Sequence, residues 1–199
     1  MQEVSVIIPN FNGMAYLDGV LAGLECQSVN NFEVILVDNG SSDGSCAFVA
    51  ARYPWVHLIE LPENFGFCKA VNEGIKASRA PYVLLLNNDI EVTENFIEEM
   101  IFAIKRHPKA FSCAARMIQF HDRDKLDDAG NYYCALGWAY ARGKGKDIHI
   151  YEKEEKIFAS CAGAAIYRKK IFDKIGYFDE EHFAYLEDMD VGYRARIHG

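Results

Sequence analysis

Short apolar runs alternate with amphipathic stretches over the first half of the chain. The runs are too short for ordinary helices, and they predict buried strands at residues 4–8, 34–37, 56–61 and 82–86. Between and after these runs, residues at helical spacing predict helices over about 14–26, over 43–53, from 64–67 onward, and between Thr93 and Pro108. This βαβαβαβα order predicts an α/β fold, with a mostly parallel central sheet and helices on both faces.

Proline and hydroxyl residues indicate where some of these elements begin or end. Pro9 is expected to close the first strand, because proline cannot continue a central ladder. Ser41 or Ser42 is expected to cap the second helix, and Thr93 is expected to cap the fourth.

The second half of the chain has a looser pattern. Residues 111–117 are a candidate strand, and residues 168–175 predict a short helix that Gly176 ends. The last stretch, 183–197, mixes aromatic and acidic residues and continues as a helix through Val191, Arg194 and Arg196. Between them, residues 121–157 are polar and predict a solvated loop.

Composition and charge narrow the classes of partner. The chain has 199 residues, is 50% hydrophobic and shows no linker, so one domain with its own core is expected. A net charge of −8 argues against a nucleic acid held through phosphate contacts. The sequence has no window of about 18 apolar residues and no signal-peptide pattern, which predicts a cytoplasmic protein without a transmembrane segment. The six cysteines lack metal-binding spacing and are expected to be reduced thiols.

Polar side chains follow three of the predicted strands at the point where each strand ends. Asn10 follows the first strand, Asp38 the second, and Asn87, Asn88 and Asp89 the fourth. Because the carboxyl ends of parallel strands meet at one edge of a sheet, these side chains are expected to converge in a ligand site. Oxygen ligands of this kind suit Mg²⁺ or Mn²⁺. The alternative is structural, since Asn and Asp are also common in turns and helix caps.

Two common nucleotide-binding motifs are missing at this edge. A dinucleotide site needs Gly-x-Gly-x-x-Gly after the first strand, where this chain has Pro-Asn-Phe-Asn-Gly at 9–13. The Walker phosphate loop, which ends in Gly-Lys-Ser or Gly-Lys-Thr, is also absent from the sequence. The sequence therefore disfavours an NAD enzyme and a P-loop ATPase.

A second acidic centre begins the last predicted helix. Glu187 and Asp188 would there favour the positive end of the helix dipole, which is a purely structural role. The functional alternative is a general base, because a sugar hydroxyl is a poor nucleophile until its proton is removed. A glycosidase would need two opposed carboxyl groups across a sugar, and adjacent residues that point different ways do not supply them.

Six segments carry a family resemblance and occur in one order along nearly the whole chain. The chain resembles the family-two inverting nucleotide-sugar glycosyltransferases of the GT-A (Rossmann-like) fold, especially the bacterial rhamnosyltransferase-like branch. The segments are Val-Ile-Ile-Pro-Asn-Phe-Asn-Gly (6–13), Val-Asp-Asn-Gly-Ser-Ser-Asp-Gly-Ser (37–45), Asn-Phe-Gly-Phe-Cys-Lys-Ala-Val-Asn-Glu-Gly (64–74), Leu-Leu-Asn-Asn-Asp (85–89), Cys-Ala-Gly-Ala-Ala (161–165), and Gly-Tyr-Phe-Asp-Glu with Tyr-Leu-Glu-Asp-Met-Asp-Val (176–191).

The resemblance implies a role for each matching residue. Asp188 would be the base that deprotonates the acceptor, with Glu187 supporting it, and Asp89 would hold Mg²⁺ or Mn²⁺ against the donor's diphosphate. Asn87-Asn88-Asp89 stands in place of the family's Asp-x-Asp motif, so only the last carboxylate is kept. Gly163 and Ala164 would shape the sugar and acceptor region. The residues implied to bind the nucleotide sugar are Pro9, Phe11, Asp38, Asn64, Gly66, Phe67, Asn72, Asn87 and Asn88.

The resemblance also implies the reaction and the layout of the chain. The expected donor is a UDP- or dTDP-linked sugar, and the expected acceptor is a saccharide or a lipid-linked saccharide, with peripheral membrane contact. Residues 1–199 would form a single GT-A domain, with a nucleotide-binding half at 1–110 and an acceptor-binding half at 111–199. Family members usually continue into another strand and a histidine, so the chain is expected to be truncated at its C-terminus.

Two other functions compete with this interpretation. A catalytically idle nucleotide-sugar-binding module would keep the donor site and lack transfer. A sugar nucleotidyltransferase would be expected to carry a Gly-rich, basic loop after the first strand, and the sequence has none there.

Overall fold

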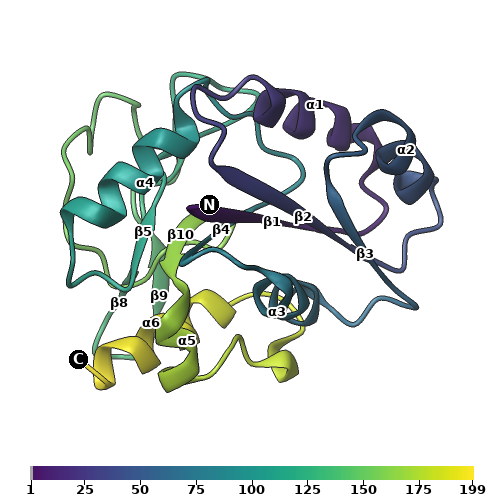
Figure 1. Cartoon of the computed structure of the whole chain (residues 1–199). Helices are drawn as coiled ribbons and strands as arrows, with labels where there is room; N and C mark the ends of the chain where they lie inside the picture. Colours follow the sequence, from purple (N-terminus) through teal and green to yellow (C-terminus); the bar gives the residue numbers. More distant parts are fainter. Residues whose placement is uncertain (1) are drawn as a thin grey trace.

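A six-stranded sheet runs through the middle of the molecule (Figure 1). The computed structural model describes residues 2–199. The strand order is β3-β2-β1-β4-β10-β5, and the first four strands in this order are parallel, whereas β10 is antiparallel to both its neighbours. The strands are β1 (Val4–Asn10), β2 (Phe32–Asn39), β3 (His57–Leu61), β4 (Tyr82–Leu86), β10 (Ala164–Arg168) and β5 (Ser112–Ala114). The predicted α/β sheet, mostly parallel and covered on both faces, is confirmed.

Three helices cover each face of the sheet (Figure 1). The helices on one face are α1 (Met14–Glu25), α2 (Ser45–Arg52) and α4 (Phe96–Arg106), and those on the other are α3 (Phe67–Ala77), α5 (Lys169–Ile175) and α6 (Glu187–Ile197). Strand β1 shows why both faces are covered: Val6 and Ile8 pack toward α1 and α4, whereas Ile7 packs toward α3. Alternate side chains of a strand point to opposite faces, so a run of apolar residues needs cover on both.

Shorter elements fill the segment between β5 and β10. They are β6 (Met117–Ile118), β7 (Leu126–Asp128), β8 (Asn131–Tyr133) and β9 (Ala139–Ala141), and a 3₁₀ helix, η1 (Glu180–His182), precedes α6. Strands β6 and β7 form one antiparallel pair, and β8 and β9 form a hairpin. The predicted solvated loop at 121–157 is therefore wrong in part. Asp128 and Arg142 are buried, because the hairpin folds back over the chain and Arg142 lies against the ring of Tyr151.

The predicted strand end and helix caps also need correction. Pro9 lies inside β1, which β4 pairs only as far as Ile7. Beyond Ile7, the N–H groups of β1 that point toward β4 have no partner strand. A proline, which has no N–H group, is therefore tolerated at position 9. The N-cap residues are Gly44 and Asn95, and neither makes a side-chain cap bond; Asp43 accepts from the first N–H of α2 and Gln27 from the Ile97 N–H of α4. The Ser41 hydroxyl instead accepts a hydrogen bond from the backbone N–H of Asn12, and Thr93 accepts one from Phe96 through its backbone carbonyl.

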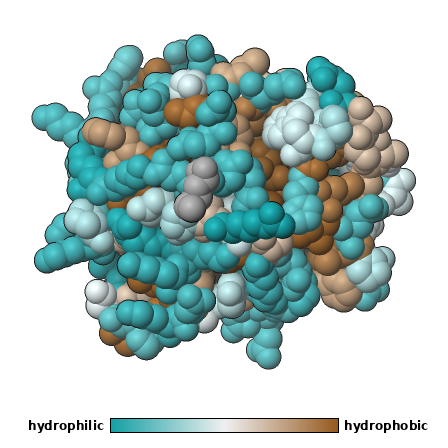
Figure 2. All heavy atoms as spheres, viewed as in Figure 1, coloured by the Kyte–Doolittle hydropathy of each residue, from teal (hydrophilic) through white to brown (hydrophobic). Residues whose placement is uncertain are grey.

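The face of the molecule in Figure 2 is mostly hydrophilic, with apolar side chains gathered right of centre, where β2 and β3 lie in Figure 1. Strand β3 is an edge strand, and its side chains are only partly covered. Within residues 2–199, no helix combines the length and the apolar character needed to cross a membrane.

Candidate functional site

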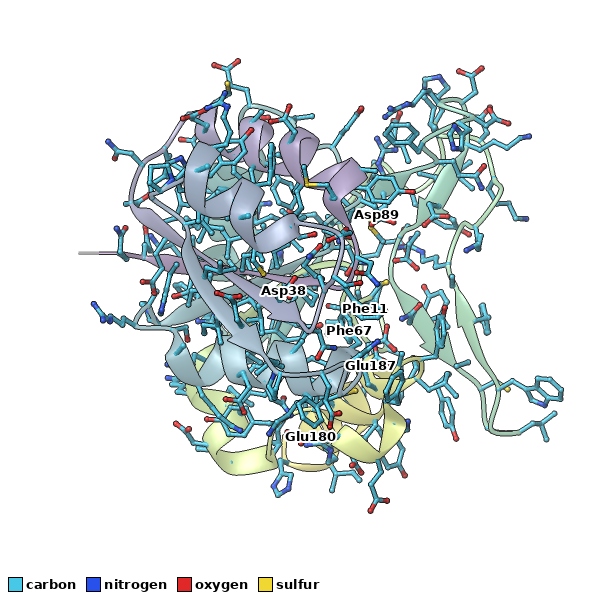
Figure 3. All side chains as sticks on the ribbon, turned by 90° about the vertical axis from the view of Figure 1, so that its right-hand side faces the viewer. Phe11, Asp38, Phe67, Asp89, Glu180 and Glu187 are labelled. Carbon is cyan, nitrogen blue, oxygen red and sulfur yellow. The ribbon has the colours of Figure 1, made fainter. Side chains whose placement is uncertain are left out.

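A cleft of about 270 Å³ opens at the carboxyl ends of β1, β2 and β4 (Figure 3). Figure 3 shows Asp89, Phe11, Phe67 and Glu187 following one another down this face, with Asp38 beside them. The cleft is lined by Pro9, Asn10, Phe11, Asn39, Asn64, Gly66, Phe67, Asn87, Asn88, Asp89 and Phe183. These residues come from separate strands and loops, and the parallel sheet brings them to one edge, as the sequence predicts.

Asn10 joins the ends of three neighbouring strands. Its side-chain N–H₂ donates to Asp38 Oδ1 at 2.8 Å, and its Oδ1 accepts from the Asn88 amide at 2.7 Å. Asp38 Oδ2 in turn accepts from the backbone N–H of Ser41 at 2.8 Å. Gly13 is required beside this network, because a Cβ there would lie 2.1 Å from the Asn88 amide nitrogen. The polar residues after the strands are thus held in fixed positions by one another.

A second amide, Asn39, fixes the loop that enters α3. Its side-chain N–H₂ donates to Asn64 Oδ1 at 2.9 Å and to the Gly66 carbonyl at 3.0 Å, and its Oδ1 accepts from the Phe65 N–H at 3.0 Å. Gly66 has φ +90° and ψ 166°, a backbone region essentially restricted to glycine. A Cβ on Gly66 would lie 2.6 Å from the carbonyl oxygen of Phe183. The group that approaches Gly66 closely is therefore Phe183 of the protein itself.

Asp89 is an exposed carboxylate on the wall of the cleft. Within residues 2–199, no side-chain hydrogen bond or ion pair engages it, and no group of three or more His, Cys, Asp or Glu residues could hold a metal by itself. Mg²⁺ is usually held by one or two carboxylates together with substrate phosphates and water. A free carboxylate beside a cleft of this size fits that mode of binding.

Glu187 and Asp188 begin α6, and both are buried, with 7% and 9% of their surface exposed. Neither lines the cleft, but Figure 3 shows Glu187 next to Phe67, which does. Asp188 Oδ2 accepts a hydrogen bond from the Asn131 amide at 2.8 Å. Burial raises the pKa of Asp188, although hydrogen bonds from the backbone of Met189 and Ala162 oppose the rise. Burial also raises the pKa of Glu187, and the neighbouring charge of Asp188 adds to it. Glu187 Oε2 is buried and has no hydrogen-bond partner within residues 2–199.

A third buried carboxyl group, Asp128 on β7, lies within electrostatic range of this pair. Burial raises its pKa to about 6, and the charge of Asp188 contributes. The same surroundings, burial first and then the charges of Asp128, Asp188 and Glu187, raise the pKa of the Cys161 thiol to about 12. A buried acidic centre with raised pKa values is typical of general acid–base chemistry.

The cleft collects eight of the predicted site residues, whereas Glu187 and Asp188 lie behind it and Asp38, Asn72 and Ala164 have structural positions in the core. Asp38 is 2% exposed and holds Asn10 in place without lining the cleft. Asn72 is also buried, and its amide donates to the Phe178 carbonyl at 2.8 Å, so it ties α3 to the C-terminal segment. Ala164, the first residue of β10, packs in the core on the face of the sheet that α1 and α4 cover. Gly163 remains beside the cleft, where its carbonyl accepts from the Asn87 N–H at 2.8 Å.

Sequence reasoning missed three residues of the site. Asn39 directly follows Asp38 at the end of the second strand, and that position was a usable signal. Phe183 and Asn131 gave no such signal, because one lies in the aromatic and acidic stretch at 183–197 and the other lies in the segment predicted to be solvated.

Comparison with known proteins gives the chain a family. The sequence profile described as "Glycosyl transferase family 2" matches residues 5–176. The chain is 26% identical over 212 residues to the N-acetylglucosaminyl-diphospho-decaprenol L-rhamnosyltransferase of Mycobacterium tuberculosis, an alignment that covers 95% of this chain and 69% of that protein. It is 26% identical over 193 residues to an uncharacterized glycosyltransferase, RT0329, of Rickettsia typhi, of which it covers 58%.

Two solved structures share the fold. S. aureus TarS 1–349 in complex with UDP-GlcNAc superimposes with a TM-score of 0.71 and 21% identity, over 98% of this chain and 53% of TarS 1–349. The mannosyltransferase PcManGT of Pyrobaculum calidifontis, in complex with GDP-Man and Mn²⁺, has a TM-score of 0.72 and 15% identity, over 99% of this chain and 52% of that chain. The chain thus spans about half the length of these structures.

The matched segment includes every residue of the cleft except Phe183. Because the family profile covers most of the chain and the structural neighbours share its sheet, the chain belongs to glycosyl transferase family 2, whose nucleotide-sugar-dependent glycosyltransferases have the GT-A fold.

Proposed function

We propose that this chain transfers a sugar from a nucleoside-diphosphate donor to a hydroxyl acceptor with inversion at the anomeric carbon. The observation that carries the proposal is a pair of carboxylates: Asp89, which is uncommitted and lines the cleft, and Asp188, which is buried behind the cleft and has a raised pKa. The first suits a diphosphate held through a cation, and the second suits proton abstraction from a hydroxyl.

The donor would lie across the carboxyl ends of the parallel strands. Its nucleoside would pack between the aromatic side chains Phe11 and Phe67, with the amides of Asn39 and Asn64 beside it. Asp89 would hold a divalent cation, Mg²⁺ or Mn²⁺, which supplies positive charge to the leaving diphosphate. Support for this arrangement comes from the solved relatives, one of which binds UDP-GlcNAc and another GDP-Man and Mn²⁺.

The transfer step would be a single displacement. Asp188 takes the proton of the acceptor hydroxyl, the oxygen attacks the anomeric carbon, and the bond to the diphosphate breaks with its electron pair on the phosphate oxygen. One displacement inverts the configuration. Glu187 Oε2, which is buried without a partner within residues 2–199, would accept a hydrogen bond from a sugar hydroxyl, since an unpaired buried oxygen is costly.

The relatives support a proposal for the donor sugar and the acceptor. We propose a UDP- or dTDP-linked donor, with rhamnose as a candidate sugar, and a saccharide or lipid-linked saccharide at the cytoplasmic side of a membrane as the acceptor. The named rhamnosyltransferase relative acts on an N-acetylglucosaminyl-diphospho-decaprenol, which is an acceptor of this kind. Residues 1–110 would bind the nucleotide and residues 111–199 the acceptor, within a single domain.

The test compares the transfer rate of Asp188→Asn with that of wild type. Release of nucleoside diphosphate is followed with dTDP-rhamnose, UDP-N-acetylglucosamine or GDP-mannose as the donor. The acceptor is polyprenyl-diphosphate N-acetylglucosamine. Asp188→Asn is expected to slow transfer by about 10²–10⁴-fold, the usual contribution of a placed base. Nucleotide binding should be unchanged, because Asp188 does not line the donor cleft.

Two outcomes would contradict the proposal. If Asp188→Asn transfers sugar at the wild-type rate, the base is another group. If the wild-type protein binds a nucleotide sugar but transfers it to no acceptor, the chain is the idle binding module.

A further inference from the structure

A side-chain hydrogen bond between Asn131 and Asp188 joins two parts of the protein that are far apart in the sequence. Asn131 lies on β8 in the hairpin, and Asp188 lies in the first turn of α6. The Asn131 Nδ2 donates to Asp188 Oδ2 at 2.8 Å, and both side chains are 9% exposed. No other side-chain donor reaches the Asp188 carboxylate within residues 2–199.

The backbone of Asn131 is fixed independently of its side chain. Its N–H donates to the Ala159 carbonyl at 2.9 Å, and its carbonyl accepts from the Phe158 N–H at 2.9 Å. Helix α6 packs closely on this segment, since a Cβ on Gly192 would lie 2.6 Å from the Ala159 Cβ. The hairpin is therefore attached through main-chain bonds, and the Asn131 amide is not needed to hold it there.

Like charges surround the carboxylate that the amide contacts. Glu187 lies beside it on α6, Asp128 faces it from β7, and two weakly acidic groups, Cys161 and the buried Tyr167, lie within electrostatic range. No cation forms an ion pair with Asp188 within residues 2–199. Burial and like charge both favour the protonated form, and only hydrogen-bond donors oppose them.

We propose that Asn131 is a positioning residue that orients the Asp188 carboxylate and keeps it ready to accept the proton of the acceptor hydroxyl. The inference rests on the proposed role of Asp188 as the base. An amide is suited to this position, since it donates a hydrogen bond without adding a charge that would move with pH. With Oδ2 engaged by Asn131, the other oxygen, Oδ1, is the one left to face the acceptor.

The first experiment titrates the Asp188 carboxyl carbon by NMR in protein labelled with ¹³C-aspartate, with the signal assigned from Asp188→Asn. In Asn131→Ala the pKa of Asp188 is expected to rise by about one unit, because a hydrogen bond to the ionised form is lost. Asn31→Ala is the matched control, since the Asn31 amide donates to Glu3 at the same distance of 2.8 Å. The control should leave the Asp188 titration unchanged.

The second experiment measures transfer against pH with the same donors and acceptor. Asn131→Ala should move the acidic limb of kcat upward by about one unit, which lowers kcat by about tenfold at pH values below the pKa of Asp188, and it should recover activity at higher pH and leave the donor KM unchanged. Asn131→Leu, which fills the space of the asparagine side chain without a hydrogen-bond donor, repeats the test if the alanine variant folds poorly. A purely structural role would instead lower activity equally at every pH.

The outcomes distinguish the inference about Asn131 from the proposal that Asp188 is the base. An unchanged Asp188 titration in Asn131→Ala, with Asp188→Asn inactive, overturns the inference alone. Wild-type transfer by Asp188→Asn overturns the proposed base and the inference together. A raised donor KM without a shifted acidic limb assigns Asn131 to donor binding and also overturns the inference.

Discussion

Three buried carboxyl groups lie within electrostatic range of one another, two at the start of α6 and one on β7. Asp128, Glu187 and Asp188 are 3%, 7% and 9% exposed, and burial raises the pKa of each. An ionised carboxylate in such a place costs stability, so natural proteins keep one there mainly where its chemistry is used. We expect this cost to be measurable at Asp128, which lies next to the base but has no proposed role in proton transfer.

Asp128→Asn tests that cost. The pKa of Asp128 is about 6 in the folded protein and near 4 when the chain is unfolded, so its ionisation removes stability as pH rises from about 4 through 6. Asparagine keeps the acceptor for the Gly130 N–H and has no charge to bury. The free energy of unfolding should therefore rise by roughly 1–3 kcal/mol at pH 7.5 and stay near the wild-type value at pH 4.

Urea unfolding followed by circular dichroism at the two pH values measures the difference. Asp127→Asn is the control, because this neighbouring carboxyl group is partly exposed and pairs with Lys144. An equal effect of Asp128→Asn at pH 4 and pH 7.5 would show that its charge is not the cause.

Between η1 and α6, the chain forms a strap at residues 183–186 that links the two sides of the cleft. Phe183, Tyr185 and Leu186 all have positive φ, at 57°, 73° and 65°, which non-glycine residues rarely adopt. The strap contacts the start of α3, where the Cys68 N–H donates a hydrogen bond to the Phe183 carbonyl at 3.3 Å. Gly66 permits this contact because it has no side chain.

Gly66→Ala should disturb the strap. The added Cβ would meet the Phe183 carbonyl, a backbone atom that cannot rotate away, and the backbone of Gly66 is unfavourable for alanine. We expect a loss of roughly 1–3 kcal/mol in the free energy of unfolding, together with weaker nucleotide binding. Gly44→Ala is the control, since Gly44 also has φ +90° but has open space around its Cβ position.

Thermal unfolding and nucleotide titration of both variants give the comparison. Equal losses of stability and unchanged nucleotide binding in the two variants would mean that backbone strain matters at Gly66 and its contact with Phe183 does not.

The elements that the sequence predicts well are those with strong local patterns. Strand β4 and helix α1 were predicted to within a residue, because their apolar spacing and turn residues agree with their burial. The hairpin of β8 and β9 could not be predicted, since strands of three residues are too short to show alternation. The cap prediction at Ser41 failed because its hydroxyl bonds to Asn10 and Asn12 in a neighbouring loop, and the one at Thr93 failed because only its backbone carbonyl bonds near the start of α4.

For the whole molecule, the parallel sheet brings residues that are distant in the sequence to one edge. Asn10, Asp38 and Asn88 are brought into one hydrogen-bonded chain only because β1 lies between β2 and β4. That convergence follows from the βα order and was predictable. The support of Asp188 by Asn131 was not, because it depends on the path of an irregular segment whose polar composition is typical of a solvated loop.

The central claim is that this edge binds a nucleoside diphosphate through a cation held by Asp89. Calorimetric titration of UDP, dTDP and GDP into wild type and Asp89→Asn, with Mn²⁺ and then with EDTA, tests it most directly. We predict that one diphosphate binds wild type with Mn²⁺, and that EDTA or Asp89→Asn weakens it at least about tenfold, or roughly 1.4 kcal/mol. Equal binding under all these conditions, or no binding of any of the three by wild type with Mn²⁺, would contradict the claim.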